Sequence, residues 1–234
     1  MQQINDLLDA KLLENHRNQE KRDYLGASII GGDCLRQIQL QYMQKEQEFS
    51  AQTLRTFAIG HCLEDLIADW MILAGFDLRT RDENGEQFGF STAEGKLKGH
   101  VDGIIFGGPD FCKYPALWEC KTLNNKSWND TAKRGVLVTK SLYFAQVQLY
   151  MTYLNLDENP CLFTALNKDT SELYHELIAF DAEAAQRYSD RAVQIIKASE
   201  NNEMMPCISS DSSFYKCKMC SYRQECLRQR GFCE

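Results

Sequence analysis

Residues 116–124, ALWECKTLN, place two charged side chains in a segment that otherwise has the composition of a buried β-strand. Charged groups are costly in such a strand unless they are paired or bound to a metal. Side chains two residues apart on a strand point to the same face, so Glu119 and Lys121 project together. Trp118 and Cys120 point to the opposite, apolar face. The fold must therefore set a carboxylate beside an ammonium on one face of this strand.

A second carboxylate, Asp102 in GHVDGII, lies on a strand predicted to pair with this one, 119 − 102 = 17 residues before Glu119. Two carboxylates on adjacent strands can share one divalent cation, and oxygen ligands with open positions suit Mg²⁺ or Mn²⁺. Lys121 could then orient or deprotonate a water and stabilise charge on a phosphate. These residues suffice for metal-assisted phosphodiester hydrolysis, although an exposed cross-strand ion pair explains them equally well.

Hydrophobic periodicity predicts the order helix, strands, helix, strands, helix, which is typical of an α/β fold with a mixed central sheet. Helices are expected over residues 1–24, just after Cys34, and over 53–74, 140–156 and 181–199. Two strands are expected within 96–124 and a hairpin over 160–180. The apolar residues of the 53–74 helix predict one buried stripe, formed by Ile59, Leu63, Leu66, Ile67, Trp70 and Leu73.

The chain of 234 residues, 44% of them hydrophobic, is expected to form a single domain (1–234) with its core at about 53–200. It has no apolar run of membrane-spanning length and no charged-then-apolar leader, so we expect a cytoplasmic protein without a membrane partner. The net charge of −7 argues against a protein that coats duplex DNA through bulk positive charge. Basic strips at 119–140 and 215–230 remain compatible with an anionic substrate.

Two predicted helices carry polar residues that could join the carboxylates. In IGHCLEDL, His61 and Glu64 are three residues apart, on one face and away from the predicted stripe. His61 could be a metal ligand, although a capping or solvated histidine is the simpler interpretation. In YFAQVQLY, Tyr143, Gln146 and Tyr150 align at three- and four-residue steps and need hydrogen-bond partners if buried. An ordinary amphipathic helix explains this second pattern as well.

The chain has ten cysteines, which in a reducing compartment are metal ligands or plain thiols rather than disulfides. Cys217, Cys220 and Cys226 are clustered in KCKMCSYRQEC. This spacing favours zinc or an iron–sulfur centre and does not decide between them. Candidates for the fourth ligand are Cys34, Cys207 and Cys233.

The motifs occur in an order that resembles a known nuclease family. A helical G-H-x-x-E, then G-x-x-D, E-x-K and Q-h-x-x-Y (h, hydrophobic), is similar to the RecB-like branch of the PD-(D/E)XK nucleases, over residues 28–226. The resemblance implies a restriction-endonuclease-like core and a metal site. Its implied ligands are His61, Asp102, Glu119 and the backbone carbonyl of Cys120. It makes Lys121 the catalytic lysine and gives Gln146 and Tyr150 a supporting role toward the site and the DNA.

The segment ASIIGGDCLRQIQLQY resembles the S-x-x-x-x-x-C-x-R segment of the members that carry a [4Fe-4S] cluster. These are the CRISPR-associated protein four family, the AddB nuclease domain and their phage-encoded relatives. The resemblance implies that Cys34 joins Cys217, Cys220 and Cys226 around a structural cluster, which staples segments 28–42 and 207–234 together. The other six cysteines are then core or surface thiols.

The function implied by the resemblance is metal-dependent hydrolysis of single-stranded DNA. Such relatives are exonucleases, often 5′→3′, with some endonuclease activity, and helicase, recombination or CRISPR-adaptation proteins are the implied partners. The resemblance to phage-encoded members also implies that Lys168 reaches the DNA. No G-x-x-x-x-G-K-[ST] motif is present, so the chain does not unwind DNA itself. The alternative is a non-catalytic DNA-binding or adaptor subunit with structural zinc, which the retained Asp102, Glu119 and Lys121 speak against.

Overall fold

The computed structural model describes residues 2–19, 22–45, 49–110 and 112–229. Cys233, one of the candidate fourth ligands, lies outside these ranges. The chain divides into two compact units. The cysteine unit comprises residues 1–25, 33–59 and 194–234, and the sheet unit comprises residues 26–32 and 60–193. Helices α3 (Ala51–Leu73) and α7 (Ala182–Glu200) each contribute residues to both units.

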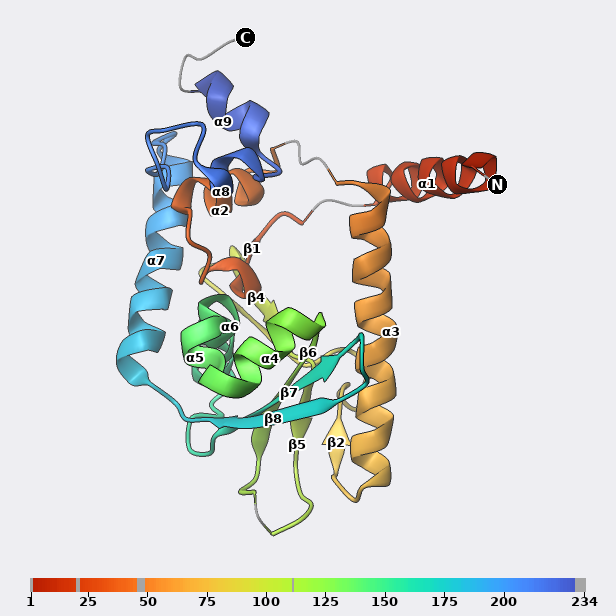
Figure 1. The fold of residues 1–234 in the computed structure, drawn as a ribbon. Coiled ribbons are helices and arrows are strands. Elements are labelled where there is room, and N and C mark those ends of the chain that lie inside the picture. The colour runs from red at the N-terminus through yellow and green to blue at the C-terminus, as the bar shows by residue number, and fades with distance from the viewer. Residues whose placement is uncertain (1, 20–21, 46–48, 111, 230–234) are drawn as a thin grey trace. The chain divides into compact units, whose positions relative to one another are not determined.

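The sheet unit is built on a five-stranded sheet in the order β2-β5-β6-β7-β8 (Figure 1). Its strands are β2 (Leu78–Arg79), β5 (Gly103–Ile105), β6 (Ala116–Leu123), β7 (Cys161–Asn167) and β8 (Leu173–Ile178). Strands β6 and β7 run parallel, and the other neighbours are antiparallel. The predicted mixed sheet is therefore confirmed, as is the hairpin that forms β7 and β8.

A smaller sheet in the order β1-β4-β3 consists of β1 (Leu25–Gly26), β3 (Gly89–Thr92) and β4 (Leu97–His100). Segment 96–124, predicted as two strands, in fact contributes three. Strand β4 pairs with β3, and the chain enters the larger sheet only at Gly103. Asp102 lies at this break, where its side chain, instead of a strand carbonyl, accepts the hydrogen bond of the Cys120 amide.

Helices cover both faces of the larger sheet. On one face, Ile67, Ala68 and Met71 of α3 pack in one core cluster with Trp118 and Cys120 of β6. The other face carries α4 (Asn125–Arg134), α5 (Val136–Thr139) and α6 (Ser141–Tyr153), as Figure 1 shows. A short 3-10 helix, η1 (Ala27–Ile29), precedes the cysteine unit's second segment.

Two contacts fix the helices of this second face. Trp128 of α4 donates its indole N–H to the Ala165 carbonyl at 3.0 Å. The ring of Tyr143 in α6 stacks on Phe163 with centroids 6.2 Å apart. The sequence predicted α6 but neither α4 nor α5.

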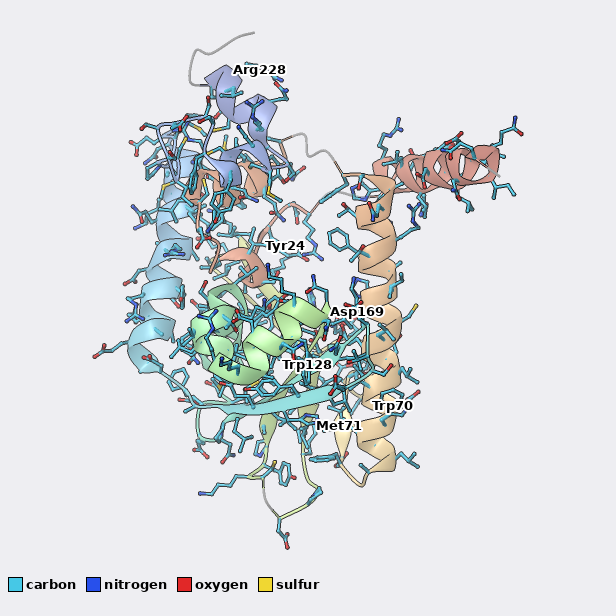
Figure 2. The ribbon with its side chains drawn as sticks, in the orientation of Figure 1. Tyr24, Trp70, Met71, Trp128, Asp169 and Arg228 are labelled. Carbon is cyan, nitrogen blue, oxygen red and sulfur yellow. The ribbon has the colours of Figure 1, made fainter. Side chains whose placement is uncertain are left out.

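The predicted stripe on α3 is largely wrong. Trp70 is 42% exposed and Leu73 is 86% exposed, whereas Ile67 is 1% exposed. Figure 2 shows Trp70 and Met71 on different sides of the helix, and only Met71 is buried. Apolar residues on this helix form two lines, and the one containing the small Ala68 packs on the sheet because it allows a closer approach. The stripe members that are instead exposed are Ile59, Leu66, Trp70 and Leu73.

The cysteine unit contains α1 (Gln2–Arg17), α2 (Leu35–Tyr42), α8 (Tyr215–Lys218) and α9 (Arg223–Gln229), with the adjoining parts of α3 and α7. The fully buried Gln39 ties α2 to the chain after α7. Its amide donates to the Glu203 carbonyl at 2.7 Å and accepts from the Met205 amide at 2.8 Å. Arg36 Nε donates to the Met205 carbonyl at 2.7 Å. Across the described ranges, no helix is both long and apolar enough to cross a membrane.

Candidate active site and cysteine cavity

Strand β6 presents its charged residues as its alternation predicts. Trp118 and Cys120 are buried in the core cluster shared with α3. Glu119 faces the other side of the sheet, where it meets α6, and its side chain is fully buried. Lys121 lies on the same face with 21% of its side chain exposed.

Asp102 is held against β6 by the backbone. Gly103 is the register partner of Trp118, so the preceding Asp102 comes to lie beside Glu119 and Cys120. Its Oδ2 accepts hydrogen bonds from the Cys120 amide at 2.8 Å and from Lys121 Nζ at 3.2 Å. The two carboxylates predicted to share a cation are thus in one site.

The Lys121 ammonium contacts three oxygens at once. It donates to Asp102 Oδ2 and, at 2.9 Å, to the Cys120 carbonyl, and it forms an ion pair with Glu119 Oε1. These are the three oxygen groups that the sequence suggested as metal ligands. The ion pairs of Lys121 with Asp102 and Glu119 are largely buried. They are therefore not the exposed cross-strand ion pair that was the simpler interpretation. A positive charge therefore already lies where these oxygens converge.

Gln146 and Tyr150 of α6 complete the polar site. Gln146 Nε2 donates to Glu119 Oε1 at 2.7 Å and to Tyr150 Oη at 3.2 Å. Both side chains are buried. Gly99 of β4 makes room for the tyrosine, since a Cβ at this position would lie 2.6 Å from the Tyr150 ring. The ring of Tyr143, from the same helix, lies 5.7 Å from Lys121 Nζ.

The second oxygen of Glu119 is the unsatisfied atom of the site. Glu119 Oε2 is buried and, within the described part of the chain, has no hydrogen-bond partner. An unpaired buried carboxylate oxygen is costly. The donor set of carboxylates and a carbonyl suits a hard divalent cation, which would satisfy this atom.

Burial and mutual repulsion raise the pKa values of two carboxyl groups here. Burial, with the charge of Asp102, raises the pKa of Glu119 to about 8 against the opposing effect of Lys121. The same causes raise the pKa of Glu64 to about 7. Burial tends to lower the pKa of Lys121, but Asp102 and Glu119 hold it well above its usual value. A bound cation would favour the ionised forms of these carboxyl groups and would therefore oppose both shifts.

Glu64 of α3 is close enough for the charges of Asp102 and Lys121 to affect its pKa, whereas His61 of the same helix is exposed. The prediction that His61 and Glu64 both lie away from the apolar stripe is wrong for Glu64. This residue precedes the buried Ile67 and Ala68 by three and four residues, so it lies on the same face of the helix. This spacing was the signal that could have placed it. His61 is exposed on α3, next to Gly60, whose Cα faces Thr122 of β6. Within the described residues, no three or more His, Cys, Asp or Glu side chains are arranged as a metal site.

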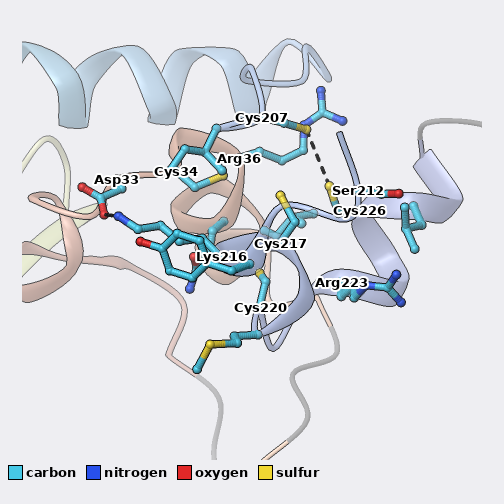
Figure 3. A pocket seen from close by; sticks show the side chains of 16 residues that line it. Asp33, Cys34, Arg36, Cys207, Ser212, Lys216, Cys217, Cys220, Arg223 and Cys226 are labelled. Atoms are coloured by element: carbon cyan, nitrogen blue, oxygen red, sulfur yellow. Dashed lines mark hydrogen bonds and ion pairs between the residues drawn. The ribbon is translucent and has the colours of Figure 1, made fainter. Parts of the chain in front are cut away.

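The cysteine unit contains a cavity of about 320 Å³ (Figure 3). Its walls include the four cysteines predicted as cluster ligands. Cys34 is the N-cap of α2, Cys217 lies in α8, Cys220 lies in the turn between α8 and α9, and Cys226 lies in α9. Cys207, predicted to be a plain thiol, lines the same cavity, with its Sγ 3.6 Å from Cys226 Sγ. The five cysteines are Cys34, Cys207, Cys217, Cys220 and Cys226.

Positive side chains accompany these thiols. Arg36, Lys216 and Arg223 also line the cavity. Lys216 forms an ion pair with Asp33, next to Cys34. Arg223 Nε is buried and has no hydrogen-bond partner among the residues the structure describes. Burial raises the pKa of Cys220, with the neighbouring thiols adding to this effect. An orphaned donor in a cavity of thiols fits an occupant that carries negative charge on sulfur.

No protein-family model matches the sequence, and no curated protein matches it. Among solved structures, the chain is similar to an alkaline exonuclease from Laribacter hongkongensis, with a TM-score of 0.56 and 16% identity over 78% of this chain and 90% of that one. The complex of that exonuclease with dAMP has a TM-score of 0.56 and 17% identity, over 76% of this chain and 89% of that one. The structure of SSO0001 has a TM-score of 0.49 and 16% identity, over 94% of both chains. The fold of the chain is therefore that of the alkaline exonuclease.

Proposed function

We propose that the chain is a metal-dependent deoxyribonuclease whose catalytic centre lies around β6. The observation that carries this proposal is the convergence of Asp102, Glu119 and the Cys120 carbonyl on Lys121, with Glu119 Oε2 left unsatisfied. The fold shared with an alkaline exonuclease adds support. Burying these charged groups costs desolvation energy, and this cost is expected at a functional site more than in a purely structural core.

Asp102, Glu119 and the Cys120 carbonyl would hold Mg²⁺ or Mn²⁺, with His61 as the fourth proposed ligand. A bound divalent ion would polarise the phosphate and lower the pKa of a water. Glu64 is a further acid close enough to feel the charge of Asp102. With its pKa near neutrality, it can hold or release a proton in the same site.

The remaining residues orient these groups. Gln146 fixes Glu119 Oε1 and is itself held by Tyr150. The Lys121 ammonium would stabilise negative charge on the phosphate and orient the attacking water. Exposed basic residues on α4, among them Lys126 and Lys133, would attract the DNA backbone. Lys168, in the turn after β7, is a further candidate for a DNA contact.

We propose single-stranded DNA as the substrate and 5′→3′ exonuclease activity as the main reaction. These finer points rest on the motif resemblance to the iron–sulfur nucleases. The structural neighbour is an alkaline exonuclease, which supports the proposed reaction type.

For the cysteine cavity we propose a structural [4Fe-4S] cluster held by Cys34, Cys217, Cys220 and Cys226. Their common cavity and the orphaned Arg223 Nε support an anionic, thiolate-bound group. Zinc bound to the same residues is the alternative. Because Cys34 and the other three are far apart in sequence, either occupant would tie distant segments of the chain together.

Cleavage of end-labelled single-stranded DNA tests the nuclease proposal. With Mg²⁺ or Mn²⁺, the full chain should release the label from a 5′-labelled oligonucleotide and progressively shorten a 3′-labelled one. It should be inactive with a chelator. Asp102→Asn keeps an oxygen that can accept from the Cys120 amide, so it should remain folded and lose cleavage. Glu94→Gln, which alters a highly exposed acid, is the matched control. Absence of cleavage by the wild type would favour the alternative, a non-catalytic DNA-binding or adaptor subunit. Cleavage by Asp102→Asn at the wild-type rate would show that the catalytic centre lies elsewhere.

A further inference from the structure

We propose that Cys207 and Cys226 form a reversible disulfide in the cluster-free protein, and that this bond closes the cysteine cavity to its metal centre. Their Sγ atoms lie 3.6 Å apart. A disulfide bond is about 2.05 Å long. The two sulfurs therefore need to approach by less than about 2 Å, a movement within the reach of side-chain rotation.

Each of the two cysteines is held in place by a separate anchor. Cys207 follows Met205, whose amide and carbonyl are both bound by side chains of α2. Cys226 lies in α9, where its amide donates to the Tyr222 carbonyl at 2.9 Å. Tyr222 is 2% exposed, so this end of α9 is fixed in the unit. The closeness of the two sulfurs is thus a property of the packed unit.

Cys207 is the cysteine of the cavity that the proposed ligand set does not use. It touches Cys226, which that set does use. A spare thiol in contact with a ligand thiol can remove that ligand by oxidation.

The oxidant is a small-molecule disulfide such as glutathione disulfide. One protein thiolate attacks it, forms a mixed disulfide and releases one glutathione thiol. The second protein thiolate then attacks the mixed disulfide, the Cys207–Cys226 bond forms, and a second glutathione thiol leaves. Two protein thiols lose two protons and two electrons, and one glutathione disulfide gains them.

The consequence for the cavity rests on the proposed function of these cysteines. Cys226 cannot donate a thiolate to iron or zinc while it is bonded to Cys207. Oxidation would therefore prevent loading, and a dithiol reductant would restore it. Formation of the bond itself depends only on the geometry of the two thiols.

Peptide mapping of the full chain tests the bond. Metal- and cluster-free protein is incubated with glutathione disulfide, alkylated and digested with trypsin, which separates residues 198–216 from 224–228. We expect these two peptides to be linked and two thiols per chain to be lost. The link should be absent in Cys207→Ser and retained in Cys62→Ser, which alters an exposed thiol of α3. Stable glutathione adducts, or a main disulfide that lacks Cys207, would overturn the proposal.

Iron loading tests the consequence separately. Oxidised wild-type protein should take up iron and sulfide only after dithiothreitol is added, whereas Cys207→Ser treated with the same oxidant should load without it. Equal loading of oxidised wild type with and without reductant would overturn the gating. If the link forms but reduced protein binds neither iron nor zinc, the disulfide stands and the proposed cofactor fails.

Discussion

Lys121 Nζ lies 3.2 Å from Asp102 Oδ2, the same oxygen that accepts the hydrogen bond of the Cys120 amide. The ammonium also contacts Glu119 Oε1 and the Cys120 carbonyl. One oxygen from each of the three groups of the proposed metal site thus already contacts one internal cation, whereas Glu119 Oε2 has no partner among the described residues. A divalent ion that binds these oxygens must displace the ammonium, after which Lys121 is free to face the phosphate.

Lys121→Met should therefore tighten Mg²⁺ or Mn²⁺ binding while it reduces the cleavage rate. Removal of the ammonium eliminates a competitor for Asp102 and Glu119 and leaves their negative charge uncompensated. Loss of a positioned catalytic group costs about 10²- to 10⁴-fold in rate. Calorimetric metal titration beside single-turnover cleavage separates the two effects. Lys140→Met, which removes a lysine bonded to Ser127, is the control. Weaker metal binding in Lys121→Met would show that the lysine organises the site instead.

Gln146→Leu should weaken metal binding and cleavage together. The substitution removes the hydrogen bond to Glu119 Oε1 and leaves Tyr150 Oη without this partner. Loss of a residue that orients a metal ligand typically costs about 10- to 100-fold in affinity or activity.

Gln148 provides a matched control on the same helix. It is equally buried, but its amide joins α6 to the Ala179 carbonyl and the Asp181 amide. Gln148→Leu should lower the melting temperature and leave the metal affinity unchanged. An equal loss of metal affinity in both variants would show that α6 acts only through stability.

The charged face of β6 could be predicted because the period of a strand allows one arrangement. Glu119 and Lys121 must share a face once Trp118 and Cys120 are buried. The buried face of helix α3 could not be predicted in this way, because its apolar residues fit two overlapping lines. Only tertiary packing determines that the line with Ala68 is buried. Glu64 belongs to that line, so the error about the stripe placed Glu64 on the wrong face of the helix.

Helix α4 and the position of Cys207 in the cavity were also not predicted from the sequence. Helix α4 has few apolar residues. Asn124 caps it by accepting from the Ser127 amide at 2.8 Å, and that spacing was a usable signal. Cys207 lacked a motif spacing. Its place in the cavity depends on α2, through the contacts of Arg36 and Gln39 with residues distant in sequence.

The metal-free protein should become less stable as the pH rises toward about 8. The folded protein holds the pKa of Glu119 at about 8, above the value of 4.5 for an unperturbed glutamate. An acid with a raised folded pKa contributes stability that is fully present below its unfolded pKa and is lost as the pH rises through the folded pKa. Glu64, with a pKa of about 7, acts in the same direction.

Glu119→Gln isolates this contribution. Melting temperatures measured in chelator between about pH 5 and pH 8 should fall more steeply for wild type than for this variant. Saturating Mg²⁺ should oppose the loss in wild type, because the ion binds the ionised carboxylates of Asp102 and Glu119. Parallel curves for the two proteins would show that Glu119 is already ionised at low pH.

Cys34→Ser should release the metal centre of the cysteine cavity and lower the melting temperature, because the link between α2 and the segment of α8 and α9 is lost. Anaerobically purified wild type should be brown, with about four irons per chain for a [4Fe-4S] cluster.

Cys207→Ser should keep the iron, the colour and the melting temperature, although the Cys207 thiol lines the same cavity. Iron lost from Cys207→Ser would make Cys207 a ligand in place of one of the four. One zinc and no iron in anaerobic wild type would identify structural zinc, and the carboxylate site would be unaffected by that result.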